Sequence, residues 1–315
     1  MNCFQRNTRI DALASGVLLH VAARAGTIPA PASAAVAANV GAGPDLIIGT
    51  LDDPFKFPDK LIDVTDVAAY LGEKNGGWYP VAEKYGMIYV SPTPDTKIDV
   101  DAMLSGVQRD MAAYRLDAYH HYETRVLRQK INWKIVVDTF LETYHLQFLH
   151  RKTVDPILYS NMTTFDAFGR NLRMIAARRN IGELRALPEA EWNLIPYTAI
   201  IYVLFPNTVF IMQGDHVETW HVFPDGDSTD DSIMYISLYT PEKAETDSAR
   251  RHWDRNMALL LATVENEDFP LSEGIQRGFY SGAQDAILFG RNEPSLQHFH
   301  KSVKAALAEG NGAAS

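Results

Sequence analysis

Apolar, β-prone residues gather in four short runs in the second half of the chain, and polar turn residues separate these runs. The runs are Tyr197 to Phe205, Thr208 to Met212, Val217 to Phe223 and Ile233 to Tyr239. Pro206-Asn207 and Gly214-Asp215 stand between successive runs, and such pairs favour tight turns. The pattern therefore predicts four strands of an antiparallel meander.

Other segments repeat their apolar residues at helical intervals. The expected helices are Asp99 to Tyr114, Asn132 to about Leu149, Ser248 to Val264, and Pro294 to Leu307, which Gly310 closes. Further strands are expected at Trp78 to Glu83, Met87 to Val90 and Tyr122 to Ile131, the first two joined through Lys84-Tyr85-Gly86. Helices that frame one antiparallel sheet predict an α+β fold.

Composition and charge exclude several classes of protein. The 315 residues are 46% hydrophobic and 22% charged, with a net charge of −10, which is typical of a globular protein with one large domain or two modest ones. A chain this acidic, without a basic block, is a poor candidate for binding nucleic acid. No stretch of eighteen apolar residues occurs, so no membrane-spanning helix is expected. We expect a cytoplasmic protein.

Cysteine usage excludes three further kinds of site. Cys3 is the one cysteine of the chain. A single thiol cannot form an internal disulfide, a cysteine-rich zinc site or a cysteine-ligated iron–sulfur cluster.

The first 45 residues differ from the rest. They contain Arg6, Arg9 and Arg24, almost no acidic residue, and an Ala/Pro/Gly tract from Ala25 to Pro44. A signal or transit peptide can have this composition, and so can a disordered leader. A misassigned start or a shifted reading frame is a third interpretation. We treat residues 1–45 as an atypical Ala-rich leader.

Potential metal ligands are densest at Asp138, Glu142, His145 and His150. A mononuclear Fe(II) site uses two imidazoles and one carboxylate and leaves positions open. His145 and His150 would lie about 140° apart on a regular helix, so they can share a metal only if the helix is distorted, for example at Gln147-Phe148-Leu149. The alternative is that both are surface or packed residues of an amphipathic helix.

Three motifs carry a resemblance to a known family. They are NWKIVVDTFLETYHLQFLH at 132–150, ENEDFPLSEGIQRG at 265–278 and FGRNEPSLQHFHKSV at 289–303. The first resembles the iron-binding helix of Rieske-type non-haem iron oxygenases, the catalytic α-subunits of aromatic-ring-hydroxylating dioxygenases. The resemblance covers about residue 46 to the C-terminus.

The resemblance implies roles for five residues. His145, His150 and Asp268 match the family's facial triad of iron ligands. Glu142 matches an acidic residue that links the iron site to a Rieske cluster in the neighbouring subunit, and Asp138 matches a polar position near the metal. An alternative role for Asp268 is as N-cap of a following helix.

The resemblance also implies a fold and a domain order. The catalytic domain would be a helix-grip (START/Bet v 1-like) fold at residues 96–315, preceded at residues 46–95 by the β-structured remnant of a Rieske domain. The ligands of the family's [2Fe-2S] cluster are missing, because Cys3 is the sole cysteine. A wrong start, a frameshift or a deletion would explain this, and upstream translation in three frames would test it.

The implied activity is hydroxylation or demethylation of a small organic substrate with O2. Mononuclear Fe(II) would activate O2, with electrons from a Rieske cluster not encoded in this chain. The implied partners are a ferredoxin or reductase and two further copies in a homotrimer. Aromatic carboxylates, other aromatic rings and methylated amines fall within the family's range of substrates. In having Glu at position 142, the chain is similar to members that act on quaternary ammonium compounds.

Two other functions stay open: a non-enzymatic small-molecule-binding helix-grip module, and an inactive gene remnant. We expect Phe140, Leu141, Phe148 and parts of Ile201 to Met212 to face the pocket. Seven further histidines are interpreted as solvated or packed, namely His120, His121, His216, His221, His252, His298 and His300.

Overall fold

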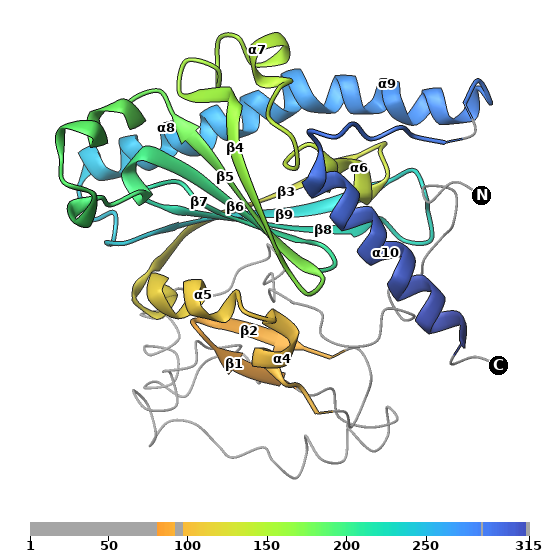
Figure 1. The fold of residues 1–315 in the computed structure, drawn as a ribbon, viewed down its shortest axis with the longest axis horizontal. Helices are drawn as coiled ribbons and strands as arrows, with labels where there is room; N and C mark the ends of the chain where they lie inside the picture. The colour runs from red at the N-terminus through yellow and green to blue at the C-terminus, as the bar shows by residue number, and fades with distance from the viewer. Residues whose placement is uncertain (1–80, 92–96, 285, 313–315) are drawn as a thin grey trace, which may run out of the picture. The chain divides into compact units, whose positions relative to one another are not determined.

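A seven-stranded antiparallel sheet is the centre of the described structure (Figure 1). The computed structural model describes residues 81–91, 97–284 and 286–312, which all belong to one of the two compact units of the chain. The strand order is β3-β9-β8-β7-β6-β5-β4. The strands are β3 (His120–Gln129), β4 (Leu158–Phe168), β5 (Asn171–Arg178), β6 (Thr198–Leu204), β7 (Thr208–Met212), β8 (Val217–Pro224) and β9 (Ser232–Thr240).

The predicted meander corresponds to β6 to β9, and the predicted α+β class is confirmed. The prediction missed β4 and β5. In β4 most side chains are exposed or half-buried, because it is the edge strand of the sheet. An edge strand of this kind leaves no apolar run in the sequence.

Both faces of the central strands are covered. All seven residues of β6 are buried, and alternate side chains enter two separate cores. Ile201 and Val203 pack in one core with Trp220, whereas Ile200 and Tyr202 pack in the other. The opposite direction of successive strand residues explains this division.

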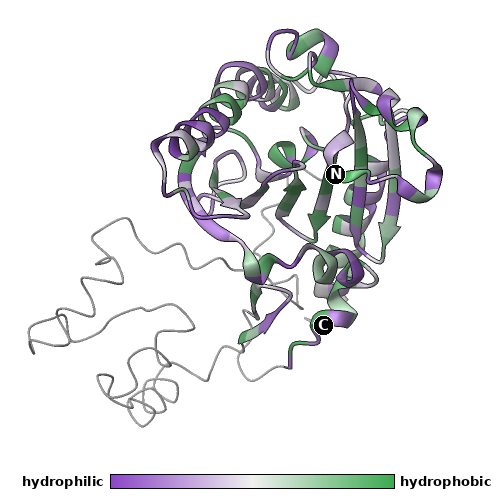
Figure 2. Cartoon of the chain, turned by 90° about the vertical axis from the view of Figure 1, so that its left-hand side faces the viewer, coloured by the Kyte–Doolittle hydropathy of each residue, from purple (hydrophilic) through white to green (hydrophobic). Residues whose placement is uncertain are grey.

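Helices and a hairpin cover these two faces. Figure 1 shows α6, α8, α9 and α10 on one side of the sheet and α4, α5 and the β1–β2 hairpin on the other. The helices are α4 (Val100–Leu104), α5 (Gln108–Tyr114), α6 (Trp133–Asp138), α7 (Leu146–Leu149), α8 (Asp247–Thr263), α9 (Phe269–Tyr280) and α10 (Pro294–Gly312). Figure 2 shows hydrophobic and hydrophilic stretches on strands and helices alike, as expected of elements with one buried side.

Two helix predictions outside the segment 132–149 need correction. The helix expected from Asp99 to Tyr114 is broken between α4 and α5, because Ser105 (φ 50°) and Gly106 (φ 116°) adopt positive φ angles that a right-handed helix excludes. Gly310 does not close the last helix, since α10 continues to Gly312. No helix in the described part of the chain has the length and apolar character needed to cross a membrane.

The hairpin of β1 (Val81–Lys84) and β2 (Met87–Val90) turns at Tyr85 and Gly86. Both turn residues have positive φ, 57° and 73°, as a two-residue type I′ turn requires. A Cβ atom on Gly86 would lie 2.5 Å from the backbone nitrogen of Asp117, so only glycine allows this close packing. The assignment of residues 46–95 to a Rieske remnant stays a prediction. Most of these residues, and all of the leader, lie outside the described residues.

Candidate metal centre and cavity

The segment that carries the two candidate histidines is not one helix. Asn132 is the N-cap of helix α6, and its side chain accepts a hydrogen bond from the backbone N–H of Lys134 at 3.0 Å. The helix ends after six residues, well before the predicted end at Leu149. Thr139 Oγ1 donates to the carbonyl of Val136 at 2.7 Å, and such back-bonding weakens a helix locally.

A second helix of one turn, α7, separates the histidines. His145 is its N-cap and His150 its C-cap, and their ring centroids are 5.0 Å apart. The distortion expected at Gln147-Phe148-Leu149 is wrong, because these residues are helical; the irregular stretch precedes His145. His150 leaves the helical conformation at φ −99° and ψ 31°. This change of backbone direction lets the two rings approach each other.

Asp268 comes from a π-helical turn. Helices α8 and α9 are joined through the π-helix η6 (Val264–Asp268), and π-turns inside α-helices are frequent at functional sites. Asp268 is buried, and its side chain makes no capping hydrogen bond to α9. Asp268 therefore stands at the N-cap position of α9, but its side chain does not act as a cap.

Three polar atoms from these segments converge. Asp268 Oδ1 lies 3.1 Å from His150 Nε2 and 3.8 Å from His145 Nε2. In the described part of the chain this is the one group of three or more histidine, cysteine or acidic side chains with potential ligand atoms within 4.8 Å of one another. Two imidazoles and a carboxylate form a donor set that suits mononuclear non-haem Fe(II).

Glu267 orients His150 from behind. Its Oε2 atom lies 2.7 Å from His150 Nδ1 and accepts a hydrogen bond from Thr153 Oγ1, also at 2.7 Å. This contact directs His150 Nε2 towards Asp268, as outer carboxylates do for metal-binding histidines. Burial lowers the pKa of His150, but hydrogen bonds and charge from Asp268 and Glu267 outweigh burial, so the net pKa is raised.

Glu142 lies directly against His145. Its carboxylate contacts His145 Nδ1 and accepts a hydrogen bond from the backbone N–H of His145 at 3.2 Å. Nδ1 itself lacks hydrogen-bond geometry in the described structure and is buried. The carboxylate therefore limits the positions that this imidazole can take.

Asp138 is not part of the converging group. Both of its carboxylate oxygens lie close to His300 Nε2, at 2.9 and 3.0 Å. With Glu142, His145 and Asp268, it lines a smaller cavity of about 230 Å³. The structure thus brings Asp138 near the candidate ligands but pairs it with helix α10.

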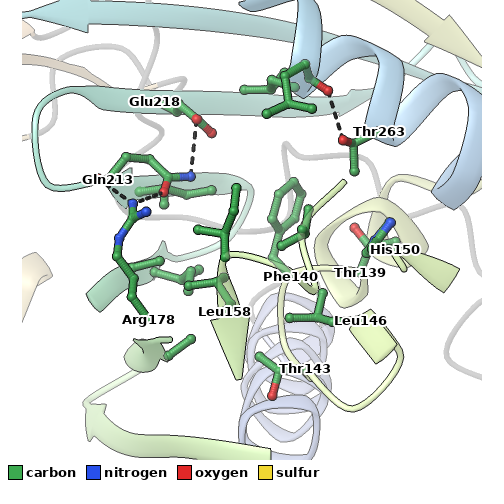
Figure 3. Close-up of a pocket in the computed structure, with 18 of the residues that line it drawn as sticks. Thr139, Phe140, Thr143, Leu146, His150, Leu158, Arg178, Gln213, Glu218 and Thr263 are labelled. Carbon is green, nitrogen blue, oxygen red and sulfur yellow. Dashed lines mark hydrogen bonds between the residues drawn. The ribbon is translucent and has the colours of Figure 1, made fainter. Parts of the chain in front are cut away.

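A cavity of about 710 Å³ adjoins the three converging side chains. Phe140, Ile201 and Ile211 line it as expected, but Leu141 is buried in the core and Phe148 is 66% exposed. Apolar side chains occupy its middle, and polar ones lie on either side of them, with Arg178, Gln213 and Glu218 together at the end away from His150 (Figure 3). The polar end consists of Arg178, Gln213, Asp215, His216 and Glu218.

The sequence patterns gave no role to several of these residues. Glu267 lies in the motif at 265–278, and its position next to Asp268 is a sequence signal that could have indicated a role at the metal site. The sequence predicts that His216 is solvated or packed, whereas the structure places it in the lining of the cavity. Arg178 and Glu218 come from separate strands, so no local pattern joins them.

The family described as "Ring hydroxylating alpha subunit (catalytic domain)" matches residues 116–309. The chain belongs to this family. Among curated proteins, no sequence matches the chain. The match to the ring-hydroxylating family includes both histidines, Asp268, and the strands and helices that surround the cavity.

Solved structures give the same fold. The quaternary ammonium Rieske monooxygenase CntA in complex with L-carnitine has a TM-score of 0.56 and 14% identity, over 73% of this chain and 60% of that chain. Naphthalene 1,2-dioxygenase from Rhodococcus sp. bound to indole has a TM-score of 0.53 and 16% identity, over 73% and 66%. The ring-hydroxylating domain described here thus spans about three-fifths of the length of CntA.

Proposed function

We propose that this chain is the catalytic domain of a Rieske-type oxygenase that hydroxylates or demethylates a small organic substrate with O2. The observation that carries this proposal is the approach of His145, His150 and Asp268 beside a large cavity. These three side chains would hold one Fe(II). Bound iron of this kind supplies reductive activation of O2 next to the substrate.

The chain's own residues prepare the site. Glu267 holds His150 at its Nδ1 atom, and Glu142 lies against Nδ1 of His145, so both imidazoles present Nε2 to the same point. Apolar side chains such as Phe140 and Trp220 line the adjacent cavity. They exclude water from the place where substrate binds, which protects reactive states from side reactions.

Electrons would come from outside these 315 residues. A Rieske [2Fe-2S] cluster needs two cysteines and two histidines, and Cys3 is the sole cysteine of the sequence. We infer that a Rieske cluster outside these residues, reduced by a ferredoxin or reductase, serves this site within a trimer. Glu142 lines both cavities, which supports its role as the link to that cluster.

Iron content tests the proposed site. The wild-type chain, reconstituted with Fe(II) without oxygen and desalted, should hold about one iron per chain by mass spectrometry of the metal. His145→Ala and Asp268→Ala should each remove most of it, because two remaining protein ligands hold iron poorly. His121→Ala, an exposed histidine on β3, should keep the wild-type content.

Two results would contradict the proposed iron site. If the wild type holds no iron but binds small aromatic molecules, the proposal fails and the chain is a binding module. Equal iron content in wild type, His145→Ala and Asp268→Ala would place the metal elsewhere.

A further inference from the structure

The polar end of the cavity contains a half-buried arginine that has no carboxylate partner. Arg178 ends strand β5 and lines the cavity. Its Nε donates to the carbonyl of Thr198 at 3.3 Å, and its Nη2 donates to the backbone and side-chain carbonyls of Gln213 at 2.6 and 3.1 Å. Among the described residues, no carboxylate lies within ion-pair distance of Arg178, and its Nη1 donates no hydrogen bond.

The two carboxylates at this end are already engaged by another cation. His216 Nδ1 lies 2.7 Å from Asp215 and Nε2 lies 3.2 Å from Glu218. Burial lowers the pKa of His216, but both carboxylates raise it more strongly, to about 9. Its hydrogen bond holds the pKa of Asp215 at about 2. At neutral pH, a histidinium therefore sits between two carboxylates, and Arg178 is left with neutral acceptors.

A guanidinium in this setting favours an anionic ligand. Burial lowers the pKa of Arg178, and the charges of Asp215 and Glu218 offset this only in part. Charge-assisted bonds from arginine to a carboxylate are stronger than bonds to neutral carbonyls. The two N–H groups of Nη1 remain available to a ligand in the cavity.

Apolar side chains connect this arginine to the candidate metal ligands. Figure 3 shows Arg178 and His150 on opposite sides of the cavity, with Phe140 and Leu158 between them. Phe140 packs edge-on against Trp220, with ring centroids 5.0 Å apart. A ligand with one charged end and an apolar body fits this order of polar and apolar surfaces.

We propose that the substrate is an organic acid whose carboxylate is bound by Arg178 and whose apolar body lies along Phe140 towards His145 and His150. The oxidation of such an acid rests on the proposed function, whereas its binding does not depend on iron. The alternative class of ligand is a quaternary ammonium ion, which would bind next to Oε2 of Glu218. The neutralising contact of His216 with Glu218 favours the acid.

Three probes of similar size and different charge test this assignment by titration calorimetry on the full chain: phenylacetate, phenylacetamide and benzyltrimethylammonium. Wild type should bind phenylacetate most tightly. Arg178→Met should weaken phenylacetate binding about 10- to 100-fold and leave phenylacetamide unchanged. Arg178→Lys should retain part of the preference for the acid.

Arg179→Met is the matched control. Arg179 is the next residue along the chain, is exposed, and pairs with Asp155 at 2.8 Å outside the cavity. This variant should bind all three probes as wild type does. Thermal unfolding of each variant reports folding, and if Arg178→Met does not fold, the acid-to-amide ratio of Arg178→Lys takes its place.

Three results would overturn the assignment. They are equal affinity of the wild type for acid and amide, an equal loss of both in Arg178→Met, and tightest binding of the ammonium ion with its loss in Glu218→Gln. Iron content is measured separately on the same samples. A chain that binds phenylacetate through Arg178 but holds no iron would refute the proposed function and keep this inference.

Discussion

The two ends of the large cavity position their polar side chains by different means. At the metal end, His145 and His150 flank a one-turn helix, and Asp268 ends a π-helical turn. At the other end, Arg178 ends strand β5 and Glu218 lies on β8. Helix irregularities therefore aim the first group, whereas the pairing of distant strands brings the second together. A short motif can encode the first arrangement, but only the folded sheet creates the second.

Each end has a histidine between two carboxylates, but the two arrangements differ. His150 lies between Glu267 and Asp268, and His216 lies between Asp215 and Glu218. The difference is that His145 Nε2 converges with His150 and Asp268 as a third potential ligand, whereas the second imidazole at the polar end, from His252, contacts only Asp215 of the two carboxylates there, at 3.3 Å. The histidines and Asp268 at the metal end can bind a metal ion. At the polar end, His216 and its two carboxylates contact one another, and Arg178 lines the cavity beside them.

The largest expected effect comes from Trp220, which lines the cavity and packs against Phe140. Its removal tests whether the two ends share one support. Its side chain is 1% exposed and belongs to the core beneath the cavity. Trp220→Ala should lower the free energy of unfolding by about 3–5 kcal/mol, since it leaves a large cavity. Urea unfolding at neutral pH measures this.

Trp192→Ala is the control for that loss. Trp192 is 42% exposed and donates one hydrogen bond to the Leu187 carbonyl, so its removal should change the unfolding free energy by less than about 1 kcal/mol. If both variants lost a comparable free energy of unfolding, Trp220 would not be a support that the two ends share.

The second effect concerns only the polar end and depends on pH. The pKa of His216 is raised from 6.5 to about 9 by Asp215 and Glu218, despite burial. A raised pKa gives stability that is complete below pH 6.5 and is lost as the pH rises through about 9. The unfolding free energy of wild type should therefore fall by up to about 3 kcal/mol over this range.

His216→Gln should abolish most of this fall. Besides the two carboxylates, His252 contacts Asp215 and Trp253 packs against the His216 ring, and neither contact supplies the negative charge that raises the pKa. His120→Gln, on the outer strand β3, should keep the wild-type slope. An unchanged slope in His216→Gln would show that the polar end does not hold a histidinium.

The metal end was largely predictable from the sequence because its residues lie in short motifs. The pairs Glu142/His145 and Glu267/Asp268 are local, and the family pattern joins them. What the sequence did not reveal was the backbone between them: apolar spacing from Asn132 to Leu149 suits a continuous helix, yet the chain unwinds after Asp138.

The polar end could not be predicted, for a topological reason. Arg178 and Glu218 are neighbours only because β5 to β8 pair in register, and no spacing in the sequence records that contact. Strand β5 itself was missed. The order of β6 to β9 follows from the four predicted strands, but the places of β4 and β5, and the cavity between the sheet and helix α8, required the fold.

The smallest expected effect concerns Glu267 and tests whether the metal end depends on its outer contact. In the wild type, His150 Nδ1 and Thr153 Oγ1 each lie 2.7 Å from the Glu267 carboxylate. Gln keeps the size of this side chain but offers them a neutral oxygen. His150 then becomes a weaker and less fixed ligand. Glu267→Gln should lower iron affinity about 10- to 100-fold, measured by competition with a chelator.

Glu265→Gln, on the same π-helix but exposed, should bind iron as wild type does. Phenylacetate binding should also stay at the wild-type level in Glu267→Gln, since Arg178 and its partners do not contact Glu267. Loss of both iron and phenylacetate would mean that the two ends are coupled through the fold. Unchanged iron affinity would mean that His150 is held by Asp268 and the end of α7 alone.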